Sequence, residues 1–183
     1  TSARHVHLTQ EHLDILFGKG YALTPKKDLS QPGQFACVEK VEVVGPKGSL
    51  KMSILGPVRP ETQIEISKTE TRTLGIDAPL RMSADLEGTP GCKIIGPKGE
   101  ITVDKGVIVA KRHAHFTPDD AKVFGVTDGQ AIQIKLDYNG RSLIFGDVIA
   151  RVSKTAGLAV HIDTDEANAA GLTGTVDGEA IIG

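Results

Sequence analysis

Two stretches of the sequence repeat one phrase: "RHVHLTQEH" at residues 4–12 and "RHAHFTPDD" at residues 112–120. Each contains an arginine, a His-x-His pair and a threonine that is followed within three residues by an acidic side chain. These two copies hold five of the chain's six histidines. Alternate residues of a β-strand point to the same face, so we expect each His-x-His pair to present two imidazoles side by side.

A third stretch, "HIDTDEANAAGL" at residues 161–172, continues the second half of this pattern. In all three copies a good helix N-cap residue stands two positions after a histidine: Thr9, Thr117 and Asp163. Acidic residues follow in the first turn and a glycine comes where the helix should end. The sequence therefore predicts, three times, a strand that ends in histidine and then a short capped helix.

Strand-like runs joined by tight turns lie between the repeats. Residues 40–55 and 92–109 share the turn "GPKG", and residues 131–152 contain an Asn-Gly turn. Short alternating strands at this spacing are typical of small barrels. We therefore expect a mainly β fold with short helices: two small, pseudo-symmetric β-barrels capped by short α-helices.

Composition excludes several classes of protein. Among 183 residues, 39% are hydrophobic and 24% charged, which is ordinary for a globular protein. The net charge of −2 gives no basic field, so we expect no nucleic-acid partner. No apolar run is long enough for a membrane span, and we expect no membrane partner. The chain begins at Thr1 and shows no signal peptide, which suggests a trimmed or processed start.

The paired histidines are candidate metal ligands. A catalytic zinc ion needs at least three protein ligands, so each pair, His5–His7 and His113–His115, requires one more. His161 could complete one set. A carboxylate could complete the other, and Glu65 is a candidate because it lies between two isoleucines in a strand-like run. Spacing leaves three rivals open: Glu39, Glu42 and Glu61. His12 is expected to be a solvated helix residue.

Other chemistry receives less support from the sequence. Arg59 stands in "GPVRPET", where two prolines could hold its guanidinium for a phosphate or carboxylate, although a surface arginine in a turn is the simpler interpretation. Arg4 and Arg112 could support the site, face a substrate or point outward. The chain has no GxSxG, P-loop or GxGxxG motif. Cys37 and Cys92 begin apolar strands without CxxC spacing and are expected to be buried thiols.

Four segments taken together resemble a known family: "RHVHLT", "GPVRPETQIEIS", "RHAHFTPDDA" and "GLAVHIDTDEANAAG". They are similar to the PduL-type phosphotransacylases, the phosphate propanoyltransferases of bacterial microcompartments, over essentially the whole chain. The resemblance implies two barrels, with residues 17–110 forming the central one and residues 1–16 crossing over to join residues 111–183 in the other. It also implies an active site with two zinc ions, one on His5, His7 and Glu65 and one on His113, His115 and His161, with Arg59 as the essential arginine.

The resemblance implies an activity as well: interconversion of propionyl-CoA or acetyl-CoA plus phosphate with acyl-phosphate plus coenzyme A. We expect direct attack of phosphate at a dinuclear zinc site, with charge neutralised by two Zn²⁺ and Arg59. A two-zinc hydrolase and a non-catalytic zinc-binding module are the alternatives. We further expect a homodimer in the microcompartment lumen, with the cytoplasm as the alternative location. Contact with the microcompartment shell would need an N-terminal segment that is not visible here.

Overall fold

The computed structural model describes all 183 residues, which divide into two compact units. The N-terminal unit comprises residues 3–29 and 33–110, and the C-terminal unit comprises residues 1–2, 30–32 and 111–183. The N-terminal unit ends at residue 110, and residues 111–183 form the main part of the C-terminal unit. Of residues 1–16, which were expected to cross over, only Thr1 and Ser2 lie with the C-terminal unit, because the next residues are hydrogen-bonded into the sheet of the N-terminal unit.

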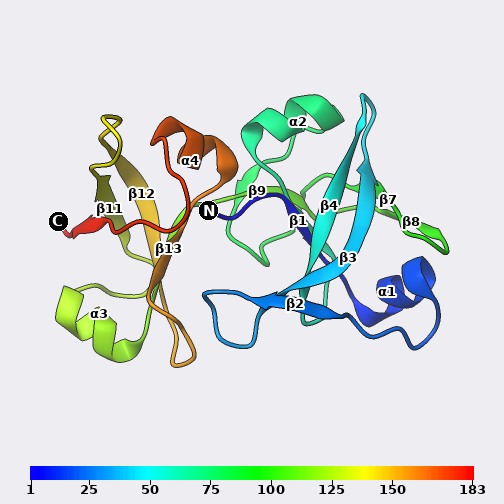
Figure 1. Ribbon diagram of the computed structural model, residues 1–183, viewed down its shortest axis with the longest axis horizontal. Coiled ribbons are helices and arrows are strands. Elements are labelled where there is room, and N and C mark those ends of the chain that lie inside the picture. The colour runs from blue at the N-terminus through cyan, green and yellow to red at the C-terminus, as the bar shows by residue number, and fades with distance from the viewer. The chain divides into compact units, whose positions relative to one another are not determined.

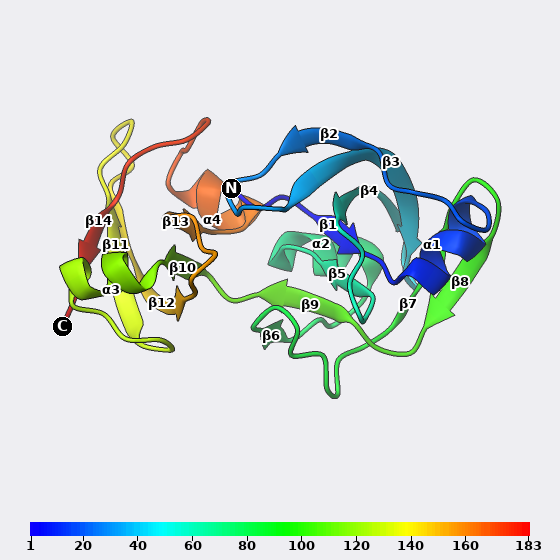
Figure 2. The same ribbon diagram turned by 90° about the horizontal axis from the view of Figure 1, so that it is seen from below.

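The N-terminal unit is built on nine strands that curl into a half-barrel (Figures 1 and 2). Its strands are β1 (His5–His7), β2 (Pro25–Asp28), β3 (Phe35–Val44), β4 (Ser49–Gly56), β5 (Gln63–Glu65), β6 (Leu80–Arg81), β7 (Cys92–Ile95), β8 (Glu100–Val103) and β9 (Val107–Ala110). Their order is β6-β9-β5-β1-β4-β3-β7-β8, with β2 also paired to β3. Alternation in β3 buries one face, including Val41 and Val43, against a core that also holds Met52 and Ile54 of β4.

The C-terminal unit has a smaller curled sheet of five strands in the order β13-β10-β12-β11-β14. The strands are β10 (His113–Phe116), β11 (Ala131–Leu136), β12 (Leu143–Val152), β13 (Ala159–His161) and β14 (Glu179–Ile181). Inward residues such as Ile132, Ile134 and Val148 form its own core. A mainly β fold with two curled sheets and short helices confirms the predicted class, although each sheet is a half-barrel rather than a closed barrel.

Four short helices follow strand ends: α1 (Gln10–Phe17), α2 (Lys68–Leu74), α3 (Pro118–Phe124) and α4 (Thr164–Ala169). Three begin at the predicted N-caps, where Thr9, Thr117 and Asp163 accept a hydrogen bond from the backbone N–H three residues on. The fourth, α2, begins after Ser67, whose own N–H donates to the Glu70 carboxylate in a capping box. None of the four is long and apolar enough to cross a membrane.

The repeated GPKG turns hold the ends of two helices. The first joins β3 to β4, and the Lys47 N–H donates to the Leu74 carbonyl at the end of α2 (3.0 Å). The second joins β7 to β8, and Lys98 donates in the same way to Leu16 of α1 (3.0 Å). Glycine is required by close approach, because a Cβ at Gly45 would lie 2.3 Å from the Leu74 carbonyl oxygen. The shared turn thus satisfies helix carbonyls that would otherwise lack partners.

The two units repeat one arrangement in chain order: strand, helix, hairpin, strand, helix. In the N-terminal unit β1 lies between β4, to which it is parallel, and β5, to which it is antiparallel. In the C-terminal unit β10 lies between β12 and β13 with the same two orientations. Each central strand carries one His-x-His pair. This shared arrangement positions the candidate site residues.

Candidate metal centres

The first candidate centre lies in the N-terminal unit. His5 and His7 come from β1 and Glu65 from β5, and antiparallel pairing places the Cα of His5 directly opposite that of Glu65. One side-chain nitrogen or oxygen from each residue lies within 4.8 Å of the other two. All three are buried, with exposed fractions of 5%, 1% and 9%. The structure therefore brings together two imidazoles and a carboxylate, which is a common ligand set for zinc.

The second candidate centre lies in the C-terminal unit and is made of three histidines. His113 and His115 come from β10 and His161 from β13, with His113 directly opposite His161. Their nitrogens also lie within 4.8 Å of one another, and their ring centroids are 4.8–5.1 Å apart. Three imidazoles converging in this way form the other ligand set that zinc adopts at catalytic sites.

Backbone carbonyls orient the first histidine of each pair. His5 Nδ1 lies 2.8 Å from the Ala3 carbonyl oxygen, and His113 Nδ1 lies 2.8 Å from the Lys111 carbonyl oxygen. Because a carbonyl can only accept, Nδ1 must carry the proton in both residues. Nε2 is then the nitrogen available to a metal ion. A carbonyl two residues upstream thus fixes the same imidazole tautomer in both centres, as metal-binding histidines require.

Charges inside the N-terminal centre favour an ionised carboxylate. Burial alone would raise the pKa of Glu65, but His5, His7 and Arg59 hold that pKa well below its usual range. Burial opposes a charge on His5, yet Glu65 raises the His5 pKa, with 3.4 Å between His5 Nε2 and Glu65 Oε2. His5 and Glu65 could hold a divalent cation, whose positive charge would take the place of a proton on His5.

The second histidine of each pair is kept neutral. Burial, with a smaller contribution from His5, lowers the pKa of His7 to about 3. Burial and the neighbouring His113 lower the pKa of His115 to about 4. Neutral imidazole is the form that ligates metal. The Nδ1 atom of His7 is also fully buried without a hydrogen-bond partner, which is rare unless another ligand satisfies it. These residues therefore fit a bound metal ion.

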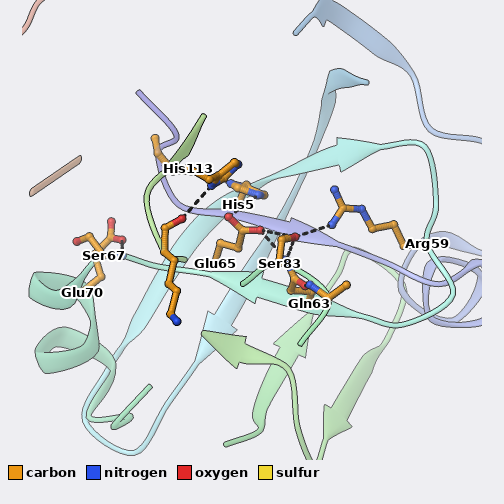
Figure 3. Close-up of polar contacts among 11 residues, drawn as sticks. His5, Arg59, Gln63, Glu65, Ser67, Glu70, Ser83 and His113 are labelled. Atoms are coloured by element: carbon orange, nitrogen blue, oxygen red, sulfur yellow. Dashed lines mark hydrogen bonds and ion pairs between the residues drawn. The ribbon is translucent and has the colours of Figure 1, made fainter. Parts of the chain in front are cut away.

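A polar network surrounds the Glu65 carboxylate (Figure 3). Gln63 and Ser83 both donate to its Oε1 atom, at 2.5 and 3.2 Å. Arg59 reaches the same network, because its guanidinium donates to the Ser83 hydroxyl at 3.2 Å. The Arg59 backbone N–H donates to the Leu8 carbonyl at 2.8 Å, which anchors the loop beside β1. Arg59 is half-buried within this network rather than a solvated turn residue. Sequence reasoning missed two members of the network: Gln63 lies inside the segment GPVRPETQIEIS but was not singled out, and Ser83 lies outside every quoted motif.

The rival carboxylates are occupied elsewhere. Glu39 accepts hydrogen bonds from Tyr21 and from the Thr24 backbone, Glu42 from Ser49, and Glu61 forms an ion pair with Lys105. None of them joins the His5–His7 pair in a triad. Of the segments that carry the four candidates, only β5 pairs with β1, so Glu65 alone lies beside the His5–His7 pair.

The topology changes the interpretation of His161. The sequence pattern matched it to His7 and His115, but its strand pairs with β10 as β5 pairs with β1, so its counterpart is Glu65. The sequence does contain a pattern that relates His161 to Glu65. "EISKTETRTLG" at 65–75 and "HIDTDEANAAG" at 161–171 each begin with a candidate ligand, Glu65 or His161, and share an N-cap residue two positions on, a capping Glu five positions on and a final glycine. The ligand-and-capped-helix pattern therefore occurs four times rather than three.

The arginine before each His-x-His pair binds the helix that follows the third ligand. Arg4 forms an ion pair with Glu70 of α2 at 2.7 Å. Arg112 does the same with Glu166 of α4 at 3.2 Å, and its guanidinium also lies 5.1 Å from the centre of the Phe145 ring. Both glutamates are the capping residues of their helices. Each arginine thus links the residues just before its His-x-His strand to the helix that follows the third candidate ligand.

Two further contacts concern histidines. His12 is half-buried, with its Nδ1 2.7 Å from the Thr62 hydroxyl, so the expectation of a solvated residue was wrong. The reason is that the first turn of α1 packs on the loop before β5, where the Thr9 N–H also donates to Thr62. In the C-terminal unit the Ser30 hydroxyl lies 3.0 Å from His161 Nε2.

The chain is similar to known proteins over most of its length. The sequence profile of a family described as phosphate propanoyltransferase matches residues 1–173. A phosphate propanoyltransferase of Thermotoga maritima is 54% identical over 170 residues, which cover 92% of this chain and 81% of that protein. The enzyme of the same name from Clostridioides difficile is 54% identical over 177 residues, covering 96% and 84%. One from Listeria monocytogenes is 48% identical over 181 residues, covering 98% and 84%.

Proposed function

The chain belongs to the phosphate propanoyltransferase family of acyltransferases, and from that premise we propose that it transfers a propionyl or acetyl group between coenzyme A and inorganic phosphate. The observation that carries the proposal is the presence of two triads, one of two histidines and a glutamate and one of three histidines, with Arg59 hydrogen-bonded to the network around the first. The two acyl groups differ by one methylene. A pocket separates them by only about 1–3 kcal/mol, so both are proposed as substrates.

Each triad would hold one zinc ion: His5, His7 and Glu65 the first, and His113, His115 and His161 the second. The preference for zinc rests on the imidazole and carboxylate ligands and on the count of three. When bound, zinc would supply Lewis acidity toward oxygen and affinity for sulfur. We propose that both centres serve the one reaction.

Arg59 would bind the phosphate. Its guanidinium presents several N–H donors in a plane, which suits two oxygens of a tetrahedral anion, and Ser83 and the Leu8 carbonyl restrain its position. In the proposed reaction a phosphate oxygen forms a bond to the acyl carbon, the carbon–sulfur bond breaks, and coenzyme A leaves as the thiolate. The positive charge of Arg59 stabilises the negative charge that gathers as the oxygen attacks.

Direct attack needs no nucleophile from the protein. Both cysteines are buried, and burial raises the pKa of Cys37 to about 11 and that of Cys92 to about 12. They are therefore thiols at neutral pH and poor nucleophiles. If incubation with propionyl-CoA left an acyl group on either cysteine, the direct reaction would be refuted.

The test is to measure zinc per chain and, in the same sample, release of coenzyme A from propionyl-CoA with and without phosphate. We expect zinc in both centres and release that requires phosphate. Release that ignores phosphate would indicate the two-zinc hydrolase instead. Zinc without release would indicate the non-catalytic binding module. Either result would overturn the proposed transfer.

Arg59→Ala then tests the phosphate-binding role. We expect kcat/KM to fall by about 10²–10³, with a raised KM for phosphate and unchanged zinc content. The matched control is Arg72→Ala. Arg72 is exposed on α2, and its substitution removes the same charge from the same unit. An equal loss in both variants would mean that only net charge matters.

Assembly and location rest on the family resemblance alone. We propose a homodimer, which light scattering on the purified chain would test. We also propose that the enzyme works in a microcompartment lumen, with the cytoplasm as the alternative. Fluorescence imaging of the tagged full-length protein in its own cells would show either discrete bodies or a uniform signal.

A further inference from the structure

One oxygen of Glu65 is fully engaged by the protein. Its Oε1 atom accepts from Gln63 Nε2 at 2.5 Å and from the Ser83 hydroxyl at 3.2 Å. The other oxygen, Oε2, is the one that faces His5 Nε2. Two donors on one carboxylate oxygen leave that oxygen little capacity for another partner. The carboxylate therefore offers its other oxygen to the centre.

The direction of each hydrogen bond follows from the chemistry of the neighbours (Figure 3). Ser83 Oγ lies 2.8 Å from Gln63 Nε2 and 3.2 Å from an Arg59 guanidinium nitrogen, both of which can only donate. The single proton of the Ser83 hydroxyl can then go only to Glu65. One hydroxyl thus joins Glu65 to Arg59 with all its hydrogen-bonding capacity used.

The Gln63 amide is held in one orientation. The Ala84 backbone N–H donates to Gln63 Oε1 at 2.7 Å, so the amide nitrogen must be the end that faces Glu65 and Ser83. Gln63 is only 2% exposed, and a buried amide with all these partners is rigid. Ala84 has a positive φ of 78°, an uncommon conformation for a residue with a Cβ, and the bond to Gln63 helps to hold it.

The fold by itself does not require this amide. Gln63 lies opposite His7 in the β1–β5 pairing, and the residue in the same place opposite His115 is Ala159. The C-terminal unit therefore builds the same pairing without an amide at this position. The glutamine accompanies the carboxylate ligand rather than the strand arrangement.

We propose that Gln63 and Ser83 are positioning residues that hold Glu65 as a one-oxygen metal ligand and fix Arg59 beside it. This inference rests on the proposed function, because it assumes a metal ion on His5, His7 and Glu65. It assigns a supporting role to two residues outside the triad of candidate ligands. Removing such supporting hydrogen bonds typically weakens metal binding by roughly 10- to 100-fold.

The experiment compares wild type with Ser83→Ala, Gln63→Met and Gln63→Glu. Gln63→Glu keeps the shape of the side chain and an oxygen for Ala84 but replaces the donor that faces Glu65. The control is Thr89→Val, which removes a buried hydroxyl that donates to Leu86 and accepts from Gly106 without touching Glu65. Thermal melts show which variants fold.

Three readouts are taken on the purified full chain: zinc retained against a graded chelator, visible absorption after cobalt replaces zinc, and KM for phosphate. We expect one of the two ions to be lost about 10- to 100-fold more easily in the Ser83 and Gln63 variants. In cobalt protein, binding of both Glu65 oxygens would raise the coordination number and weaken the visible bands. Ser83→Ala should also raise KM for phosphate more than KM for propionyl-CoA. Thr89→Val should change only the melting temperature.

Wild-type zinc affinity and an unchanged cobalt spectrum in Ser83→Ala and in either folded Gln63 variant would overturn the inference while leaving the proposed function intact. Equal loss of zinc in Thr89→Val would also overturn it, since general destabilisation would then explain the effect. Absence of zinc from the wild type would instead overturn the proposed function and this inference with it.

Discussion

The two candidate centres share a backbone arrangement and differ in one ligand. Each places a His-x-His strand between a parallel and an antiparallel neighbour, and each takes its third ligand from the antiparallel strand. That ligand is Glu65 in one unit and His161 in the other. With a divalent cation bound, three neutral imidazoles would leave the centre a net charge of +2. Two neutral imidazoles and a carboxylate would leave it a net charge of +1. One backbone arrangement can therefore hold two candidate centres that differ in net charge.

The surroundings of the third ligand differ as much as the ligand itself. Glu65 is held from the same strand by Gln63 and from a loop by Ser83. His161 has Ala159 in the corresponding place, and its Nε2 contacts the hydroxyl of Ser30. A carboxylate has two equivalent oxygens, so hydrogen bonds from the protein must occupy one of them to leave the other for the metal ion. A single contact is enough to orient an imidazole. Variants of these residues test whether the two centres really differ in this way.

Loss of the third ligand should have the largest effect. If both centres serve one reaction, as we propose, Glu65→Ala and His161→Ala should each bind one zinc ion fewer than wild type and lose more than about 10²-fold in kcat. Elemental analysis and the coenzyme A release assay measure these two quantities. If one variant kept nearly full activity, its centre would be structural and the two would not be functional equivalents.

Exchange of the third ligands should have a smaller and unequal effect. Glu65→His leaves the buried donors of Gln63 and Ser83 without their acceptor, so we expect a loss of about 1–3 kcal/mol in the free energy of unfolding. His161→Glu faces no such network and should be less destabilising. Chemical denaturation of both variants with zinc bound checks this. Equal losses would mean that the supporting network contributes nothing specific.

The GPKG turn occurs only in the N-terminal unit and offers a test of that unit's stability. A Cβ at Gly96 would lie 2.6 Å from the Leu16 carbonyl oxygen of α1. Gly96→Ala should therefore reduce the free energy of unfolding by about 1–3 kcal/mol through overpacking. Gly146→Ala in the C-terminal unit is the control, because a Cβ there meets nothing within 4 Å. A neutral Gly96→Ala would show that the turn can shift away from the helix.

The arginines before the histidine pairs should show the smallest difference. The Arg112 side chain is less exposed than the Arg4 side chain, at 29% against 43%. We expect Arg112→Ala to cost about 1 kcal/mol, including its contact with Phe145, and Arg4→Ala less than that, since solvent screens an exposed pair. Thermal melts at low and high salt would separate the two. A larger salt-dependent loss at Arg4 would reverse this ranking.

Much of the local structure follows from sequence because its causes lie within a few residues. Caps, helix ends and tight turns depend on neighbours such as Thr117 and Asp120, so three of the four helices could be predicted. The fourth was missed because its copy begins with glutamate instead of histidine. The pairing that places Glu65, and not Glu39, beside His5 involves residues far apart in the chain. The same is true of the contact between Ser83 and Arg59. Spacing along the sequence carries no information about such pairs.

Residue type and periodicity along the chain were enough to predict the class of fold, the helix caps and five histidines as candidate metal ligands, because these features act locally. The family resemblance, and not a local pattern, assigned Arg59 to the site. Tertiary structure decided which strand lies beside which. It placed β1 in the sheet of the N-terminal unit, against the predicted crossing of residues 1–16. It also made His161 the counterpart of Glu65 and surrounded that glutamate with Gln63 and Ser83. The physical reason is that hydrogen bonding between strands, and not order along the chain, sets which side chains meet.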